Sequence, residues 1–280
     1  MSSVIHTHPL SYGQSSDLAD MLIIELSSNL MQFCELQSGN FNPLYICSFP
    51  LDNTLNKSMS DQLLIAINHF KFSKRKYETV LVNEVNSNFT LCPSSFYKSE
   101  DTRILLEFNC GNSDNKLVLT DEINPTIKLV YSMDISLKST LDKLFPQHQL
   151  KHSITVLSRL MLNTEELSKI NIIVCVRETV IEVIVKQNNQ LILSNQYTIK
   201  ITEDVLYYVL FILEQYHLDP TTVLLTLVGN FESNSEIVVS LKKYVKNIHL
   251  SMGHKALKWQ NLKGMPQHYN YTLLNRLFCE

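Results

Sequence analysis

The sequence predicts a two-domain α/β protein, because one order of segments occurs twice along its 280 residues. Each half opens with three short runs rich in β-branched and aromatic residues, which is typical of a β-meander. Each half then continues with alternating helical and strand-like patterns. Hydrophobic residues make up 45% of the chain and charged residues 18%, so the chain can bury a core for two domains.

The first half begins with three strand-like runs joined by short polar turns. The turn at 38–40 reads Ser-Gly-Asn and favours a hairpin, because Gly39 can adopt positive φ without steric cost. Ser58 and Asp61 predict a capped helix, and a further strand follows that helix. The segments expected here are strands at 22–27, 30–36 and 41–49, a helix at 58–70 and a strand at 79–85.

A small inserted subdomain is expected near 89–120, because short β-rich runs interrupt the alternation there. These runs are expected as strands at 89–97, 104–110 and 116–120. Regular alternation then resumes and completes the first domain. It comprises a strand at 127–133, a helix that begins at Asp134, a strand at 147–153 and a helix at 154–167.

The second half repeats the opening meander and then alternates again. Its segments are strands at 172–176, 181–186 and 191–199, a helix at 203–216, a strand at 223–229 and a helix at 235–245. A meander followed by alternating helix and strand is the order of a ribonuclease-H-like or actin-like half-domain. We therefore expect a flexible N-terminal tail at 1–20, a first domain at 21–167 and a second domain with a C-terminal tail at 168–280.

Four segments carry a resemblance to a known family. They are FTLCPSSFY at 89–97, DISLKSTLDKLFPQHQLKHS at 134–153, ITEDVLYYVLFILEQYHLDP at 201–220 and HYNYTLLNRLFCE at 268–280. They resemble an uncharacterised, domain-of-unknown-function family of Bacteroidetes proteins that has the actin-like ATPase fold. A more distant resemblance, carried by the order of elements, is to the actin-like scaffold protein of type IV pilus assembly. Both imply a duplicated ribonuclease-H-like fold with mixed sheets, and neither assigns a function, because one fold hosts many functions.

Nucleotide binding is the first function that this resemblance implies. Actin-like ATPases hold phosphates on two hairpin turns of the kind Asp-x-Gly-Ser/Thr, where the missing Cβ lets backbone amides approach oxygen. The matching positions here are Glu25 and Ser27 in the first turn and Arg177 in the second, so both turns lack the glycine. Gly229 matches the glycine that contacts adenosine. We expect a degenerate cleft, as in a pseudo-ATPase, with no cofactor and no ATP hydrolysis.

Two other kinds of site find little support in the sequence. A ribonuclease-H-like nuclease needs carboxylates that converge on metal ions, and Glu25, Glu35 and Glu84 are the candidates. They are isolated strand glutamates without an acid-rich surrounding. His148 and His152 share one face of an expected strand, but no Cys or carboxylate lies at ligand spacing from them. We therefore expect neither a metal site nor a catalytic residue.

Charge and composition exclude other classes of function. The 24 basic and 27 acidic residues give a net charge of −3, which offers no electrostatic reason to expect nucleic acid as a partner. The basic stretch at 71–76 is short and is interpreted as a solvated helix end. We expect a cytoplasmic protein without membrane insertion, because the six cysteines are scattered, the opening residues lack a signal-peptide pattern and the longest apolar run is 206–213.

The C-terminal segment at 254–280 leaves two interpretations open, since it either folds back onto the first domain or docks a partner through Trp259. The expected function is that of a non-enzymatic scaffold or interaction protein, whose protein partner and oligomeric state remain unassigned. The alternative is an adenine-nucleotide-binding protein that uses the interdomain cleft. These two functions differ in whether Ser27, Arg177 and Gly229 converge on one cleft, and whether that cleft is open or filled.

Overall fold

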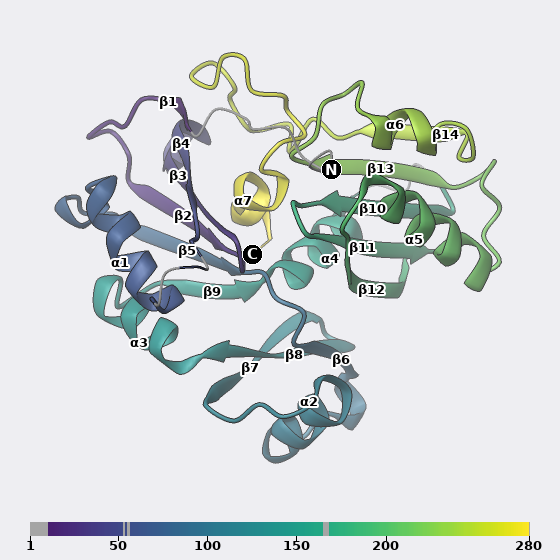
Figure 1. Cartoon of the computed structure of the whole chain (residues 1–280), viewed down its shortest axis with the longest axis horizontal. Coiled ribbons are helices and arrows are strands. Elements are labelled where there is room, and N and C mark those ends of the chain that lie inside the picture. Colours follow the sequence, from purple (N-terminus) through teal and green to yellow (C-terminus); the bar gives the residue numbers. More distant parts are fainter. Residues whose placement is uncertain (1–10, 53, 55–56, 165–167, 280) are drawn as a thin grey trace.

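The computed structural model, which describes residues 11–52, 54, 57–164 and 168–279, contains two large sheets and one small sheet. Figure 1 shows the first large sheet on the left, the second on the right and helix α7 (Tyr271–Asn275) between them. The small sheet lies below them, near the centre of the view. The described part of the chain contains no helix that is long and apolar enough to cross a membrane.

The first large sheet has six strands in the order β1-β4-β3-β2-β5-β9. Strands β2, β3 and β4 form an antiparallel meander, and β5 and β9 extend it in parallel. Helices α1 and α3 cover one face, where alternate β2 residues such as Leu22 and Ile24 are buried. The predicted capping box of Ser58 and Asp61 begins α1. The bounds are β1 Ser11–Gly13, β2 Met21–Leu26, β3 Leu30–Gln37, β4 Asn42–Pro50, α1 Met59–His69, β5 Thr79–Glu84, α3 Ile135–Leu144 and β9 Gln149–His152.

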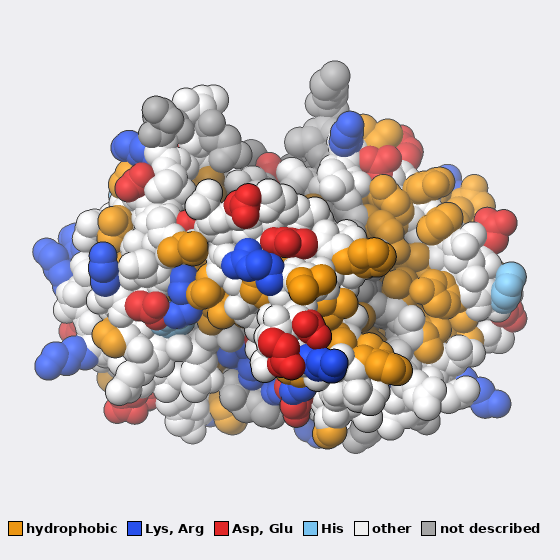
Figure 2. Space-filling view, turned by 90° about the horizontal axis from the view of Figure 1, so that it is seen from below, with side chains coloured by type: hydrophobic (Ala, Val, Ile, Leu, Met, Phe, Trp, Pro, Cys, Tyr) orange, Lys and Arg blue, Asp and Glu red, His pale blue; other side chains and the backbone are white. Residues whose placement is uncertain are grey.

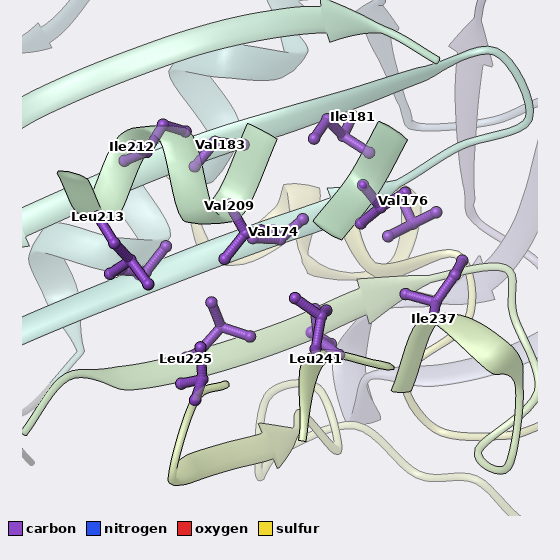
Figure 3. Packing of buried hydrophobic residues seen from close by; sticks show 14 of the residues in the cluster. Val174, Val176, Ile181, Val183, Val209, Ile212, Leu213, Leu225, Ile237 and Leu241 are labelled. Atoms are coloured by element: carbon purple, nitrogen blue, oxygen red, sulfur yellow. The ribbon is translucent and has the colours of Figure 1, made fainter. Parts of the chain in front are cut away.

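The second large sheet has five strands in the order β12-β11-β10-β13-β14. Helices α5 and α6 cover its outer face, and Figure 3 shows their apolar side chains meeting those of β10, β11 and β13. Each such side chain stabilises the fold by about 1.5–3 kcal/mol when it is fully buried. The bounds are β10 Ile170–Val176, β11 Val180–Gln187, β12 Gln190–Thr198, α5 Thr202–Gln215, β13 Leu224–Gly229, α6 Glu236–Leu241 and β14 Asn247–Leu250.

The two large sheets share one topology. In each, an antiparallel meander is followed by a helix, a parallel strand, a second helix and a further parallel strand. Strands β4-β3-β2-β5-β9 of the first sheet therefore correspond in order to β12-β11-β10-β13-β14 of the second. This repetition confirms the duplicated ribonuclease-H-like fold with mixed sheets.

The inserted part of the chain forms a three-stranded antiparallel sheet with one helix. Its elements are β6 Phe89–Pro93, α2 Thr102–Cys110, β7 Lys116–Asn124 and β8 Ile127–Asp134. The strand expected at 104–110 is wrong, because this segment is the body of α2. Leu106 is buried whereas Ile104 and Phe108 are exposed, a separation that a helix produces and a strand does not. Short apolar runs leave helix and strand undistinguished by periodicity.

Two helices fill the space between the large sheets. Helix α4 (Ser153–Asn163) packs on the inner face of β10, β11 and β12, and α7 packs on the inner face of β2 and β3. The two helices also contact each other. Leu273 and Leu274 of α7 join Ile23, Cys34 and Leu81 in one core cluster. The C-terminal segment is thus folded back onto the first domain, and Trp259 packs at the edge of the same cluster.

Candidate functional site between the two domains

The two turns expected to hold phosphate face each other between the domains. In the first, the hydroxyl of Ser27 donates to the carbonyl of Leu30 at 2.8 Å. In the second, the amide of Arg177 donates to the carbonyl of Val180 at 2.9 Å. Asn29 of the first turn donates to the carboxylate of Glu178 in the second. The turns are therefore joined directly to each other.

Arg177 lies at the centre of a buried ion cluster that spans the two domains. Its Nη1 is 2.5 Å from Oε1 of Glu25 on β2, and its Nε is 2.8 Å from Oε2 of Glu182 on β11. The side chains of Arg177, Glu25 and Glu182 are 14%, 2% and 0% exposed. The formal charge of this trio is −1, so the cluster already carries an excess of negative charge.

The C-terminal helix completes the cluster. The hydroxyl of Thr272 donates to Oε2 of Glu25 at 2.5 Å and accepts from Nη2 of Arg177 at 2.9 Å. Asn83 on β5 donates to the same carboxylate at 3.3 Å and to the carbonyl of Thr272 at 3.2 Å. Burial opposes the charge of Arg177, but the carboxylates of Glu182 and Glu25 outweigh that effect and raise its pKa well above its usual value.

Gly229 is also committed to contacts within the protein. Its φ is +114°, and a Cβ at this position would lie 2.0 Å from the carbonyl oxygen of Val176. Its amide donates to the carbonyl of His268 at 2.8 Å, and the side chain of the adjacent Asn230 accepts from the amide of Asn270 at 3.0 Å. The glycine therefore allows β13 to approach the turn after β10, and the C-terminal segment covers it.

All four cleft positions named from the sequence thus border the interdomain space, and the chain itself occupies that space. All residues of α7, from Tyr271 to Asn275, and the following Arg276 are buried. Two surface pockets of about 580 and 500 Å³ lie elsewhere, and neither is lined by Glu25, Ser27, Arg177 or Gly229.

The carboxylates considered for a nuclease do not meet. Glu35 binds Arg75 and accepts from the hydroxyl of Tyr77 at 2.6 Å, and it lies three residues along β3 from Gln32, the strand partner of Glu25. Glu84 accepts from Asn86 at 3.0 Å. Within the described residues there is no group of three or more His, Cys, Asp and Glu side chains that could hold a metal ion.

His148 and His152, which share one expected strand in the sequence, both make hydrogen bonds within the fold. His152 is fully buried at the end of β9, where its Nδ1 accepts from the amide of Ile154 at 3.2 Å and caps α4. Burial is the main cause that lowers its pKa to about 3, so the ring is neutral. His148 precedes β9, and its Nδ1 is 2.8 Å from the carbonyl of Phe145.

Two partners of Arg177 were not foreseen from the sequence. Glu182 is the lone carboxylate in the apolar run of β11 and lies opposite Cys175 in the sheet, a pattern that marks a buried charge in need of a partner. Thr272 gives no comparable signal, because its role depends on where α7 packs.

The buried carboxyl group of Glu84 should make the stability of the protein depend on pH. Burial raises its pKa to about 7, above the value of about 4.3 expected in the unfolded chain. The folded protein therefore binds more protons between these values and loses stability as the pH rises from 4.5 to 7. Glu84→Gln removes this loss. The free energy of unfolding of the variant, relative to that of the wild type, should therefore rise by about 3 kcal/mol between pH 4.5 and pH 8.

Urea denaturation at several pH values measures this difference. The control is Glu203→Gln, which replaces an exposed glutamate of α5 and should shift stability by the same small amount at every pH. A parallel pH dependence in Glu84→Gln and the wild type would contradict the prediction.

Comparison with known proteins places this fold in a family. Residues 14–248 match the model of DUF3822, described as a protein of unknown function. The chain belongs to the DUF3822 family. This finding confirms the resemblance to an uncharacterised family. A search of curated proteins found no match for this DUF3822 protein.

Solved structures of other proteins share its fold. A protein of unknown function with an actin-like ATPase fold from Bacteroides thetaiotaomicron VPI-5482 has a TM-score of 0.78 and 21% identity, over 93% of this chain and 96% of that chain. The PilM–PilN type IV pilus biogenesis complex matches with a TM-score of 0.56 and 11% identity, over 92% of this chain and 94% of that chain. These similarities confirm the actin-like ATPase fold of the DUF3822 protein.

Proposed function

We propose that this DUF3822 protein acts by binding another protein, and that its interdomain site is held closed instead of binding and hydrolysing nucleotide. The observation that carries this proposal is the buried cluster in which Arg177 bridges Glu25 and Glu182 beside Thr272 of α7. The guanidinium that a phosphate would need is already neutralised by two carboxylates.

The energetic cost of opening this site supports the same conclusion. A phosphate chain between the turns would have to displace Thr272 and draw Arg177 away from its carboxylates. Removing one partner from a buried ion pair costs about 3–5 kcal/mol. Glu25 and Glu182 would then stand unpaired next to an incoming anion, and Glu178 at the turn adds a further negative charge.

A protein with this fold is also seen together with a protein partner, in the PilM–PilN type IV pilus biogenesis complex. A closed actin-like body of this kind offers a rigid frame with a large surface. That surface is available for binding without any change in the interdomain site.

Calorimetric and thermal-shift titrations with ATP and ADP, each with Mg²⁺, test the proposal. A ligand at 100 times its dissociation constant stabilises the native state by about 2.7 kcal/mol, so tight binding is easily detected. We expect no binding heat and no shift at millimolar nucleotide. A matched Glu25→Gln, Glu182→Gln double variant leaves Arg177 without carboxylate partners and is the variant in which weak anion binding should first appear. Saturable binding to the wild type would overturn the proposal.

A further inference from the structure

Strand β12 is an edge of the second sheet, and no strand of the described residues pairs with its outer side. It is nine residues long, reads QLILSNQYT, and contains neither a charged residue nor proline. The amide of Ile199, just after the strand, bonds to the carbonyl of Thr179 on the β11 side. Since bonding direction alternates along a strand, Ser194, Gln196 and Thr198 direct their backbone groups outward. Consistently, the amide of Gln196 is bonded by the side chain of its own neighbour, Asn195, at 2.9 Å.

The other sheet edges in the described part of the chain are short or protected. Strands β1, β9 and β14 have three or four residues, and β6 has five and ends in proline. Strand β7 also has nine residues, but it carries Asp121 and Glu122. The guanidinium of Arg159 donates to the carbonyl of Glu122 at 2.7 Å. Such devices prevent edge pairing in natural proteins, whereas β12 is long and carries neither charge nor proline.

An aromatic ridge borders this open edge. We define the ridge as Tyr197 of β12 with Tyr207, Tyr208 and Phe211 of α5. The rings of Tyr197 and Tyr208 stack with centroids 4.5 Å apart, and those of Tyr207 and Phe211 stack at 6.1 Å. Tyr207 is 60% exposed and Phe211 39%. Figure 2 shows the second domain on the right with a broad hydrophobic area and few charges inside it.

The charges around the ridge are mostly acidic. Between Gln187 and Leu218 the charged residues are Lys200, Glu203, Asp204 and Glu214, which sum to −2. Glu203 and Glu214 are exposed near the two ends of α5. A two-fold pairing of β12 with a second copy would bring one α5 antiparallel to the other and set these like charges against each other. A basic partner relieves that repulsion, and its cations can also stack on tyrosine faces.

We propose that β12 and the aromatic ridge form a docking site for an extended segment of another protein, which adds as a sixth strand beside β12. The segment alternates apolar residues, which pack against Tyr197 and the ridge, with polar ones, and it carries Lys or Arg toward Glu203 and Glu214. Main-chain hydrogen bonds supply the affinity and alternate side chains the specificity. This inference rests on the proposed protein-binding function and names the chemistry of the partner.

Selection from a random 12-residue peptide library against the purified full-length protein tests the proposal. We expect enriched peptides with alternating apolar residues and a net positive charge, whose binding weakens with salt. Their affinity should fall at least tenfold in Tyr207→Ser and in Gln196→Pro, which removes an outward amide. Tyr244→Ser, a tyrosine that is 53% exposed after α6, is the matched control and should bind as the wild type does. Circular dichroism confirms that each variant is folded.

Three results would overturn the inference. The first is enrichment of no such peptides, and the second is equal binding to Tyr207→Ser and the wild type. The third is a dimer in light scattering that Gln196→Pro dissociates, because a second copy would then occupy the edge. Nucleotide titration of the same samples separates the two proposals. If nucleotide binds and the selected peptides still bind at the ridge, only the closed interdomain site is contradicted. If neither nucleotide nor peptides bind, only the docking site is contradicted.

Discussion

Replacing Arg177 with methionine is expected to destabilise the protein by about 3–5 kcal/mol. The substitution leaves the carboxylates of Glu25 and Glu182 buried without their cation and removes a hydrogen bond to Thr272. Urea denaturation of the wild type and the variant at pH 7 measures the difference.

The matched control for this prediction is the triple variant Arg177→Met, Glu25→Gln, Glu182→Gln. It removes the whole charge cluster while keeping the side-chain volume similar. Replacing a complete buried ion group by uncharged residues often leaves the stability nearly unchanged. We therefore expect it to recover most of the stability that Arg177→Met loses. If Arg177→Met alone is as stable as the wild type, the guanidinium does not join the domains as described.

Gly229→Ala is expected to cost about 3 kcal/mol or more, and it tests why this glycine is present. The backbone of Gly229 has φ of +114°, and an added Cβ would lie 2.0 Å from the carbonyl oxygen of Val176. Strain at such a position costs about 1–3 kcal/mol, and the overlap with fixed backbone adds a similar amount. Thermal and urea denaturation of the purified variant give the value.

Gly39→Ala is the control for that experiment. A Cβ at Gly39 meets no atom within 4 Å, and its φ lies outside the positive region. We expect a change within about 0.5 kcal/mol there. Equal effects of the two substitutions would show that Gly229 is not required by its close contact with Val176.

Much of the fold follows from local patterns in the sequence. The paired meanders and the capped start of α1 at Ser58 are properties of short windows, and the structure has both of them. The sequence names Glu25, Ser27, Arg177 and Gly229 as positions of a degenerate nucleotide cleft, and in the structure all four border the interdomain space. Their positions follow from element order, because equivalent turns of a duplicated fold face each other.

The contents of that space did not follow from local patterns. Thr272 bonds to Glu25 across 247 residues of sequence, and no short window indicates where a five-residue helix will pack. In the sequence, Glu25 matches the acid of the first phosphate turn, whereas Arg177 replaces the acid of the second. In the structure these two residues bind each other, which long-range packing decides. Helix α2 is missed for a different reason, because the periodicity of a short apolar run does not distinguish a helix from a strand.

Amide hydrogen exchange of the segment 268–279, with and without millimolar Mg-ATP, tests the central claim most directly. If α7 closes the interdomain site, its amides should exchange only through large-scale unfolding, as slowly as those of β2 and β10. Nucleotide should leave these rates unchanged. Rapid exchange of 268–279 in the free protein, or exchange that nucleotide accelerates, would show that α7 leaves the site and would contradict a permanently closed interdomain site.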